Sequence, residues 1–539
     1  MILVRNLRLE IDEPHDALIS KGAGKLKIRK EKIRSFILVK QSFDARKKDD
    51  LHYICSAAFD VSGNEAQIMK SSRSQDVSLY KDGAEEYSRS IPQLQLPSES
   101  DRPVIVGFGP AGMFAALVLA KAGLRPIVIE RGKKASDRKE SIENLRRNGI
   151  LDPESNVQFG EGGAGTFSDG KLNTGTHDSR ISYVLREFFR HGAKENILYD
   201  SKPHIGTDIL INVVQNIREE IISLGGDVRF ETRLERIILS EGRVTGIEIS
   251  SHSEKQLVSC SRLILAIGHS ARDTFEMLLK AGVPMERKAF SMGARIEHLQ
   301  KDINAAQYGK NSSLPMAADY SLSVHLPDLP GVYTFCMCPG GEVFAAASEE
   351  GGVCTNGMSY SSRNGENANS ALLVSLQPED FPYDDVLAGM LWQREIEQRA
   401  FSCAGRNYSA PAQLVGDFLS GRPSTGAGKV KPSYLPGVAW GDLHEVLPEK
   451  ITSAMEKAIP ELGRKLSGFD DPEAVLTAPE CRSSSPVRIL RGKNLQSEIA
   501  GLFPCGEGAG YAGGITSASV DGIRCAEMII EEMNHKGTL

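Results

Sequence analysis

Residues 103–130 read PVIVGFGPAGMFAALVLAKAGLRPIVIE: an apolar run, a glycine-rich turn, a long apolar segment, a second apolar run and a closing acid. Gly107, Gly109 and Gly112 match the G-x-G-x-x-G pattern, and Glu130 stands at the usual distance beyond it. In a βαβ unit the first glycine makes the turn after the strand. The second lets the backbone approach a pyrophosphate, and the third lets helix and strand pack closely. The stretch therefore predicts a site for a dinucleotide.

The surroundings of the pattern favour this interpretation over a plain α/β core unit with a glycine turn. Ala116 and Gly123 stand where the helix needs small residues to lie against the sheet. The pyrophosphate would rest on the N-terminus of the helix that starts near Pro110, where free N–H groups and the helix dipole favour anions. Glu130, at the end of the second strand, would accept hydrogen bonds from the adenosine ribose.

Four later segments can return the chain to the same ligand. Residues 157–172, VQFGEGGAGTFSDGKL, are rich in glycine, which lets backbone N–H groups come close to a ligand. Residues 228–237 read as a strand that begins a β-meander, and residues 262–268, RLILAIG, read as a strand ending in Gly268. Residues 501–529 read as strand, acid-bearing turn, glycine pair and helix.

Several of these motifs resemble those of FAD proteins of the glutathione-reductase type. AIGHS, from Ala266 to Ser270, is similar to their A-T-G motif, although Ile267 replaces the usual Thr. FPCGEGAG resembles their C-terminal G-D/E motif, in which Glu507 would hold the flavin ribityl chain. More specifically, the chain from about residue 20 to its end resembles one bacterial family of uncharacterised FAD-dependent, or NAD(FAD)-utilising, dehydrogenases. The segments that carry this resemblance include GEGGAGTFSDGKL, SMGARIEH, FCMCPGGEV, TNGMS, NANSALLV and CGEGAGYAGGI.

The resemblance implies bound FAD and an α/β fold. We expect a Rossmann-like FAD-binding βαβ domain of three-layer ββα architecture, an inserted α+β substrate domain and a small N-terminal α+β module. Lys171 would be a cation near the flavin or a partner in a surface ion pair. The sequence predicts no catalytic residue and no metal ligand. The residues expected to contact the cofactor are Gly107, Gly109, Pro110, Ala111, Gly112, Glu130, Arg131, Gly162, Gly163, Gly165, Thr166, Lys171, Leu234, Ala266, Gly268, Gly506, Glu507, Gly513, Gly514 and Ile515.

The chain divides into stretches of different character. Within the first, RKEKIRSFILVK at 29–40 reads as a basic helix whose charges ordinarily form a solvated face. We expect an N-terminal α+β module at 1–90, a polar linker at 91–101, the first part of the FAD-binding domain at 102–285, an inserted substrate or cap domain at 286–474 and the C-terminal part of the FAD-binding domain at 475–539.

Length and composition describe an ordinary globular protein. The 539 residues suffice for two or three domains, with 40% hydrophobic and 25% charged residues and a net charge of −6. This balance gives no reason to expect nucleic acid or a membrane as a partner. No apolar run approaches the ~20 residues that span a bilayer, and the N-terminus lacks the apolar region of a signal peptide. We expect a cytoplasmic protein; nothing in the sequence indicates its oligomeric state.

Nine cysteines in such a chain should be mostly free thiols. There is no C-x-x-C pair, so the redox dithiol of the disulfide reductases is absent. Cys336 and Cys338 would share one face of a strand. We interpret them as small buried residues rather than as a metal or redox pair, because no second ligand pair with zinc spacing exists. Arg482 and Arg488 are candidates for binding a substrate carboxylate or phosphate, or for pairing with acids between domains.

These observations predict an FAD-dependent oxidoreductase that transfers a hydride between a small organic substrate and the flavin. NAD(P)H stays possible as the electron donor, although the chain has no second dinucleotide motif. The alternatives are an NAD(P)H-dependent flavoprotein monooxygenase, a flavin-dependent RNA-modifying or RNA-binding protein that works through the basic N-terminal helix, and a non-catalytic flavin sensor.

Overall fold

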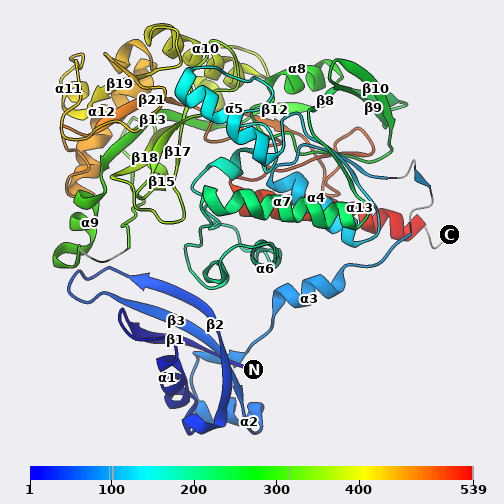
Figure 1. The fold of residues 1–539 in the computed structure, drawn as a ribbon, viewed down its shortest axis with the longest axis vertical. Helices are drawn as coiled ribbons and strands as arrows, with labels where there is room; N and C mark the ends of the chain where they lie inside the picture. Colours follow the sequence, from blue (N-terminus) through cyan, green and yellow to red (C-terminus); the bar gives the residue numbers. More distant parts are fainter. Residues whose placement is uncertain (96–97, 100–101, 313, 315, 537–539) are drawn as a thin grey trace.

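The computed structural model describes residues 1–95, 98–99, 102–312, 314 and 316–536. A small N-terminal body is set off from a larger body that contains the remaining sheets (Figure 1). Part of the linker predicted at 91–101 falls outside the described residues. Within the described residues, no helix is long and apolar enough to cross a membrane.

The N-terminal body has the expected α+β composition. Its antiparallel sheet has the strand order β2-β3-β1-β4. The side chains of Phe43 and Tyr308 meet edge to face, which joins this body to the rest of the protein. The elements are β1 (Ile2–Glu10), α1 (Ala17–Leu26), β2 (Ile33–Asp44), β3 (His52–Val61), α2 (Glu65–Ser72), β4 (Val77–Leu79) and α3 (Gly83–Ser90).

The basic helix predicted at 29–40 was wrong. Residues Lys30–Lys32 form one turn of 3-10 helix, and β2 begins directly after it at Ile33. The stretch is rich in β-branched and aromatic side chains, which favour a strand. Pairing with β3 along the whole of β2 then decides the conformation. The basic charges therefore lie on a short turn and a strand, not on a helix.

The FAD-binding fold predicted around the glycine motif is confirmed. Its parallel sheet has the order β23-β11-β5-β6-β7, with α4, α7 and α13 packed on one face. The meander β8-β9-β10 packs on the other face. The bounds are β5 (Val104–Val106), α4 (Pro110–Lys121), β6 (Ile127–Ile129), α5 (Ala135–Asn148), α6 (Arg180–Arg190), α7 (Thr207–Ser223), β7 (Asp227–Arg229), β8 (Thr232–Ser240), β9 (Arg243–Ser251), β10 (Glu254–Ser259), β11 (Leu263–Leu265), α8 (Arg272–Lys280), β23 (Leu502–Pro504) and α13 (Ile515–Lys536).

Alternation along the short parallel strands produces the three layers. Ile105 faces the cluster that holds the apolar side chains of α4, α7 and α13. Its neighbours Val104 and Val106 face the cluster shared with the meander. Successive side chains of a strand point to opposite faces, so a strand covered on both faces is apolar throughout. The continuous apolar runs in the sequence reflect this double coverage.

The second domain is built on a seven-stranded mixed sheet of order β14-β15-β18-β13-β21-β19-β20. Its central strands, β13 and β18, are almost entirely buried. The bounds are β12 (Met285–Arg287), β13 (Phe290–Leu299), α9 (Gln300–Tyr308), β14 (Ser323–Val324), β15 (Val332–Cys338), β16 (Glu342–Ala345), β17 (Thr355–Met358), β18 (Asn367–Leu376), α10 (Ala388–Cys403), β19 (Ala410–Leu414), α11 (Val415–Leu419), β20 (Val438–Trp440), α12 (Glu449–Lys465), β21 (Val475–Glu480) and β22 (Val487–Ile489).

The end of the second domain lies later in the chain than the position we set at residue 474. Strand β21, at Val475–Glu480, pairs with β13 and β19 and so belongs to the seven-stranded sheet. The chain then pairs β22 with β12 before it returns to the parallel sheet at β23. Entry to and exit from the second domain therefore run side by side.

Candidate functional site

A cavity of about 620 Å³ lies between the parallel sheet and the second domain. Its floor consists of the turns that follow β5, β6, β11 and β23, which are the carboxyl ends of parallel strands. Open α/β sheets bind their ligands at this edge. The volume falls in the range of ~300–1,000 Å³ typical of small-molecule and cofactor sites.

The glycine-rich turn after β5 brings the backbone close to this cavity. Gly107 has φ +98°, and an added Cβ would lie 2.3 Å from the carbonyl oxygen of Ala266. Gly109 is the N-cap of α4 and lines the cavity. Across from it, a Cβ on Gly163 would come within 2.9 Å of the Gly109 Cα. Two glycine loops thus approach each other at a helix N-terminus, where backbone N–H groups attract phosphate.

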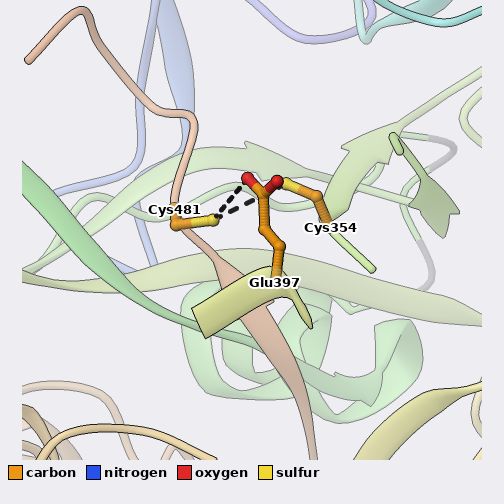
Figure 2. A group of neighbouring side chains, drawn as sticks. All are labelled: Cys354, Glu397 and Cys481. Carbon is orange, nitrogen blue, oxygen red and sulfur yellow. Dashed lines mark hydrogen bonds between the residues drawn. The ribbon is translucent and has the colours of Figure 1, made fainter. Parts of the chain in front are cut away.

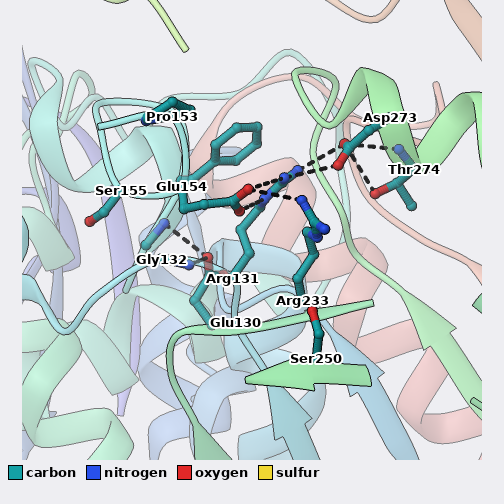
Figure 3. Close-up of polar contacts among 12 residues, drawn as sticks. Glu130, Arg131, Gly132, Pro153, Glu154, Ser155, Arg233, Ser250, Asp273 and Thr274 are labelled. Atoms are coloured by element: carbon teal, nitrogen blue, oxygen red, sulfur yellow. Dashed lines mark hydrogen bonds and ion pairs between the residues drawn. The ribbon is translucent and has the colours of Figure 1, made fainter. Parts of the chain in front are cut away.

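Glu130 connects this turn to two other backbone segments, and its contact with Gly132 is drawn in Figure 3. It is buried, and its carboxylate accepts hydrogen bonds from the backbone N–H groups of Phe108 at 2.8 Å, Gly132 at 2.9 Å and Gly160 at 2.9 Å. Three backbone donors therefore occupy most of its acceptor positions. Glu130 also lines the cavity. The ribose contact predicted for it stays a prediction, and the structure adds an organising role.

Arg131 occupies the same end of the cavity. Its guanidinium donates to Glu154 at 2.8 Å and to both carboxylate oxygens of Asp273 at 2.9 Å (Figure 3). It also lies over the Phe159 ring, 4.3 Å from the centroid. The planar guanidinium is thereby fixed at the wall beside Glu130, with its charge neutralised by two acids.

The opposite end of the cavity is formed by the turn before α13. Gly513 and Gly514 lead into the helix, and both line the cavity together with Ile515. Glu507 accepts one hydrogen bond from Gly514 N–H at 3.3 Å, and burial raises the pKa of its carboxyl to about 7. The N-terminus of α13 points its partial positive charge at whatever occupies this part of the cavity.

Four of the residues expected to contact the cofactor do not line the cavity; they shape its walls instead. Gly112 lets α4 pack on β5, because a Cβ there would lie 1.9 Å from the Gly107 oxygen. Thr166 is buried, and its hydroxyl donates to the backbone of Glu161. The remaining two, Gly162 and Gly506, have φ of +77° and +76°. The expected residues that do line it are Gly107, Gly109, Pro110, Ala111, Glu130, Arg131, Gly163, Gly165, Lys171, Leu234, Ala266, Gly268, Glu507, Gly513, Gly514 and Ile515.

These features fit FAD. The cavity joins a dinucleotide-type turn at one helix N-terminus to a second helix N-terminus at α13, and glycines form the cradle that a side chain would fill. His269 lines the cavity with a buried Nδ1 that has no hydrogen-bond partner among the described residues. Burial and nearby arginines lower its pKa to about 3, so the ring is neutral. A neutral ring beside the cavity can bond a polar ligand atom.

The second domain contributes the other wall, which sequence reasoning identified only in part. Thr334, Cys336 and Glu480 line the cavity from β15 and β21. Arg482 also lines it, but its guanidinium is bound to Glu397, which is pairing with an acid, the second of the two roles expected for it. The signal that could have indicated this wall was the C-x-C sequence around Met337.

Lys171 lies in a buried charge cluster. Its ammonium is 2.7 Å from Asp169, and Arg363 reaches the same carboxylate at 2.8 Å. Lys171 and Arg363 both line the cavity. Two cations share one carboxylate here, so this cluster of three side chains has one more positive than negative charge. We expected Lys171 to be either a cation near the cofactor or a partner in a surface ion pair. The structure shows an ion pair, but the pair is buried at the cavity wall.

Cys354, Glu397 and Cys481 lie close together beside this wall and resemble a metal-ligand set (Figure 2). The Cys481 thiol donates to the Glu397 carboxylate at 3.1 Å. That carboxylate also accepts two hydrogen bonds each from Arg272 and Arg482. Two buried guanidinium groups already neutralise it, and their charge opposes a metal cation at this place. We interpret the cluster as an arginine–carboxylate network that joins the domains.

Comparison with known proteins identifies the cofactor of this site as FAD. Residues 102–272 match the model of an FAD binding domain, and residues 289–483 match that of the FAD-dependent protein, C-terminal domain-like family. Residues 1–60 match a domain of unknown function. The class of protein that these matches and the cavity define is a flavoprotein oxidoreductase with FAD as its cofactor.

The family follows from a full-length relative. The chain is 47% identical to an uncharacterized protein of Clostridium beijerinckii over 542 residues, which covers 99% of each chain. It belongs to the same family as that protein, a family of FAD-dependent proteins. The glutathione-reductase type of FAD fold stays a prediction.

Solved structures with a similar arrangement are distant. The flavin-dependent brominase Bmp2, as a triple mutant, is 12% identical, with a TM-score of 0.38 and 80% of each chain covered. A geranylgeranyl bacteriochlorophyll reductase-like protein of Thermoplasma acidophilum is 13% identical, with a TM-score of 0.36 and coverage of 80% and 78%. E. coli quinol fumarate reductase FrdA is 12% identical, with a TM-score of 0.37 and coverage of 83% and 71%. Likenesses this remote carry no argument about the reaction.

Proposed function

We propose that this flavoprotein transfers a hydride between a small organic substrate and its FAD. The observation that carries the proposal is the continuity of the cavity, which runs from the glycine turn at Gly109 to Glu480 on the second domain. Bound FAD supplies a two-electron acceptor or donor there. The cavity wall from the second domain is then the place for the substrate.

Two carboxyl groups of the wall can hold a proton near neutral pH. Burial raises the pKa of Glu480 to about 7, against the charge of Arg295, whose Nη1 lies 3.1 Å from both carboxylate oxygens. Burial also raises the pKa of Glu507 to about 7. Removing a hydride from an alcohol or amine carbon releases a proton from its oxygen or nitrogen. A carboxyl group with a pKa near the working pH is suited to accept that proton.

Positive charge on the same wall favours an anionic substrate. Lys171 and Arg363 share the single carboxylate of Asp169, so these three side chains together carry one positive charge at the cavity. We infer that the substrate carries a carboxylate or another anionic group, which these side chains would bind.

An anaerobic absorbance titration of the FAD-loaded protein with NADH and NADPH tests the source of the hydride. We expect little bleaching of the oxidised flavin, because the chain has no second dinucleotide motif. Bleaching should instead follow addition of hydroxy acids or of amines that carry a carboxylate. Stoichiometric bleaching by NADH or NADPH would contradict this part of the proposal and favour a nicotinamide-dependent reductase or monooxygenase.

A further inference from the structure

Cys336 and Cys338 form a thiol pair that the hydride-transfer proposal does not use. Cys336 lines the cavity and is partly exposed, whereas Cys338 is fully buried behind it. The Cys338 thiol lies within hydrogen-bonding distance of the carbonyl oxygen of Cys336, at 3.1 Å. One thiol therefore lines the cavity, and the sulfur of the second is buried next to the backbone of the first.

The backbone is bent to present Cys336. The pairing of β15 with β18 shifts register between Phe335 and Cys338, and Cys336 has φ +45°, in the left-handed region. A bulge of this kind re-aims a side chain and is frequent beside active sites. A non-glycine residue in the left-handed region costs energy, so the surrounding structure must impose it. The regular strand that we expected, with both cysteines on one face, is interrupted here.

The surroundings make the two thiols unequal. A hydrogen bond from the Cys338 thiol and the charges of Lys171 and Arg295 lower the pKa of Cys336 to about 6, although Asp169 opposes them. Burial raises the pKa of Cys338 well above its ordinary value. A thiolate beside a neutral thiol is the arrangement of an attacking and a resolving cysteine.

Arg295 contacts both cysteines. Its Nη2 donates to the Cys336 carbonyl oxygen at 2.9 Å and lies 3.6 Å from the Cys338 sulfur. The other titratable groups whose charge reaches Cys336 are Glu480 and Glu507, from β21 and the turn before α13. Burial keeps both of these carboxyls protonated below about pH 7, where they oppose the thiolate least.

We propose that Cys336 and Cys338 are a dithiol–disulfide couple whose substrate is a small disulfide. The Cys336 thiolate attacks one sulfur of the disulfide, forms a mixed disulfide and releases one thiolate. The Cys338 thiol then gives its proton to water and attacks the Cys336 sulfur, which closes the internal disulfide and releases the second thiolate. The substrate gains two electrons, and the cysteine pair loses two. This thiol chemistry requires no flavin, whereas its connection to the electrons of FAD rests on the proposed function.

The test follows thiolate release from dithiobis-nitrobenzoate, a chromogenic small disulfide, by the FAD-loaded protein. In every protein used for this assay, exposed Cys403 is replaced by serine, because its own reaction with the reagent would add to the signal. We expect a fast phase of about two thiolates per chain, reduced to about one in Cys338→Ala and absent in Cys336→Ala. The rate should rise with pH through about 6 and then level off, because the thiolate is the nucleophile. A fast phase that persists in Cys336→Ala would overturn the proposal.

Alkylation mapping provides a second readout that needs no variant at the pair. Wild-type protein is treated briefly with iodoacetamide at pH 6.5, and modification is measured at Cys336 and at exposed Cys403. We expect Cys336 to react at least about tenfold faster; equal or slower reaction would contradict its activation. FAD content is measured in the same samples. If the protein holds FAD but Cys336 does not react fast, the dithiol–disulfide proposal alone is refuted. If Cys336 reacts fast but the protein holds no FAD, only the assignment of the cofactor site is refuted.

Discussion

The carboxylate of Glu130 joins three backbone segments that are far apart in the sequence. Its oxygens accept from Phe108 in the glycine turn, from Gly132 after β6 and from Gly160 in the second glycine loop. The sequence predicted an acid at this position and a ribose as its partner. It could not predict the backbone donors, because the loop that carries Gly160 approaches only through tertiary folding. One side chain thus fixes the shape of the cavity wall before any ligand is present.

Replacing Glu130 with Gln tests this residue. Glutamine has one acceptor oxygen, and its amide group would face backbone N–H donors. We expect FAD affinity to fall by roughly tenfold or more, since hydrogen bonds to a charged group contribute about 1.5–3 kcal/mol. Glu231→Gln is the matched control, because Glu231 is exposed. Titration of the released flavin back into both variants gives the affinities; equal values would count against the role of Glu130.

At the scale of elements, the sequence correctly predicted the helices and strands whose conformation depends on adjacent residues. The apolar runs and the glycine motif placed β5, α4 and β6 correctly, because helix, turn and parallel strands there follow from adjacent residues. The stretch 29–40 failed, because its pairing with β3 outweighs its basic, helix-like composition. The wall around Cys336 also escaped prediction. The bulge that exposes it arises between β15 and β18, which are well separated in the chain.

The network around Glu397 is a buried contact that joins three elements. Glu397 on α10 bonds Arg272 at the start of α8 and Arg482 after β21, all fully buried. Removing one partner of a buried ion pair leaves uncompensated charge and costs about 3–5 kcal/mol. We therefore expect Glu397→Gln to lower the free energy of unfolding by that amount, measured by urea denaturation.

Glu395→Gln, two residues away on the same helix, is the control for that substitution. Glu395 is partly exposed, accepts from the Tyr383 hydroxyl and pairs with Arg399, and such solvent-exposed pairs contribute about 0–1 kcal/mol. Similar losses from both substitutions would show that the buried network has no special weight. A preserved midpoint in Glu397→Gln would contradict its role in holding the two domains together.

At the scale of the whole molecule, the site exists because two sheets face each other. The parallel sheet supplies the turns that cradle a dinucleotide, and the seven-stranded sheet supplies the wall that carries Cys336 and Glu480. Entry and exit of the second domain are paired as β12 and β22, so the two chain connections lie next to each other. The sequence predicted the cofactor half of this site from the glycine motif and four later segments. It could not place the opposite half, because that wall depends on how the domains pack.

The flavin content of purified Gly109→Val tests the central claim most directly. An added Cβ at Gly109 lies 3.7 Å from its nearest protein neighbour, the Gly163 Cα, which is ordinary contact, so the fold should tolerate the change. Gly441→Val is the control, since a Cβ there meets nothing within 4 Å. We expect the control to retain the flavin of the wild type and Gly109→Val to lose at least about nine-tenths of it, because the side chain fills the pyrophosphate position. Full FAD occupancy in a folded Gly109→Val protein would contradict the assignment of this cavity to FAD.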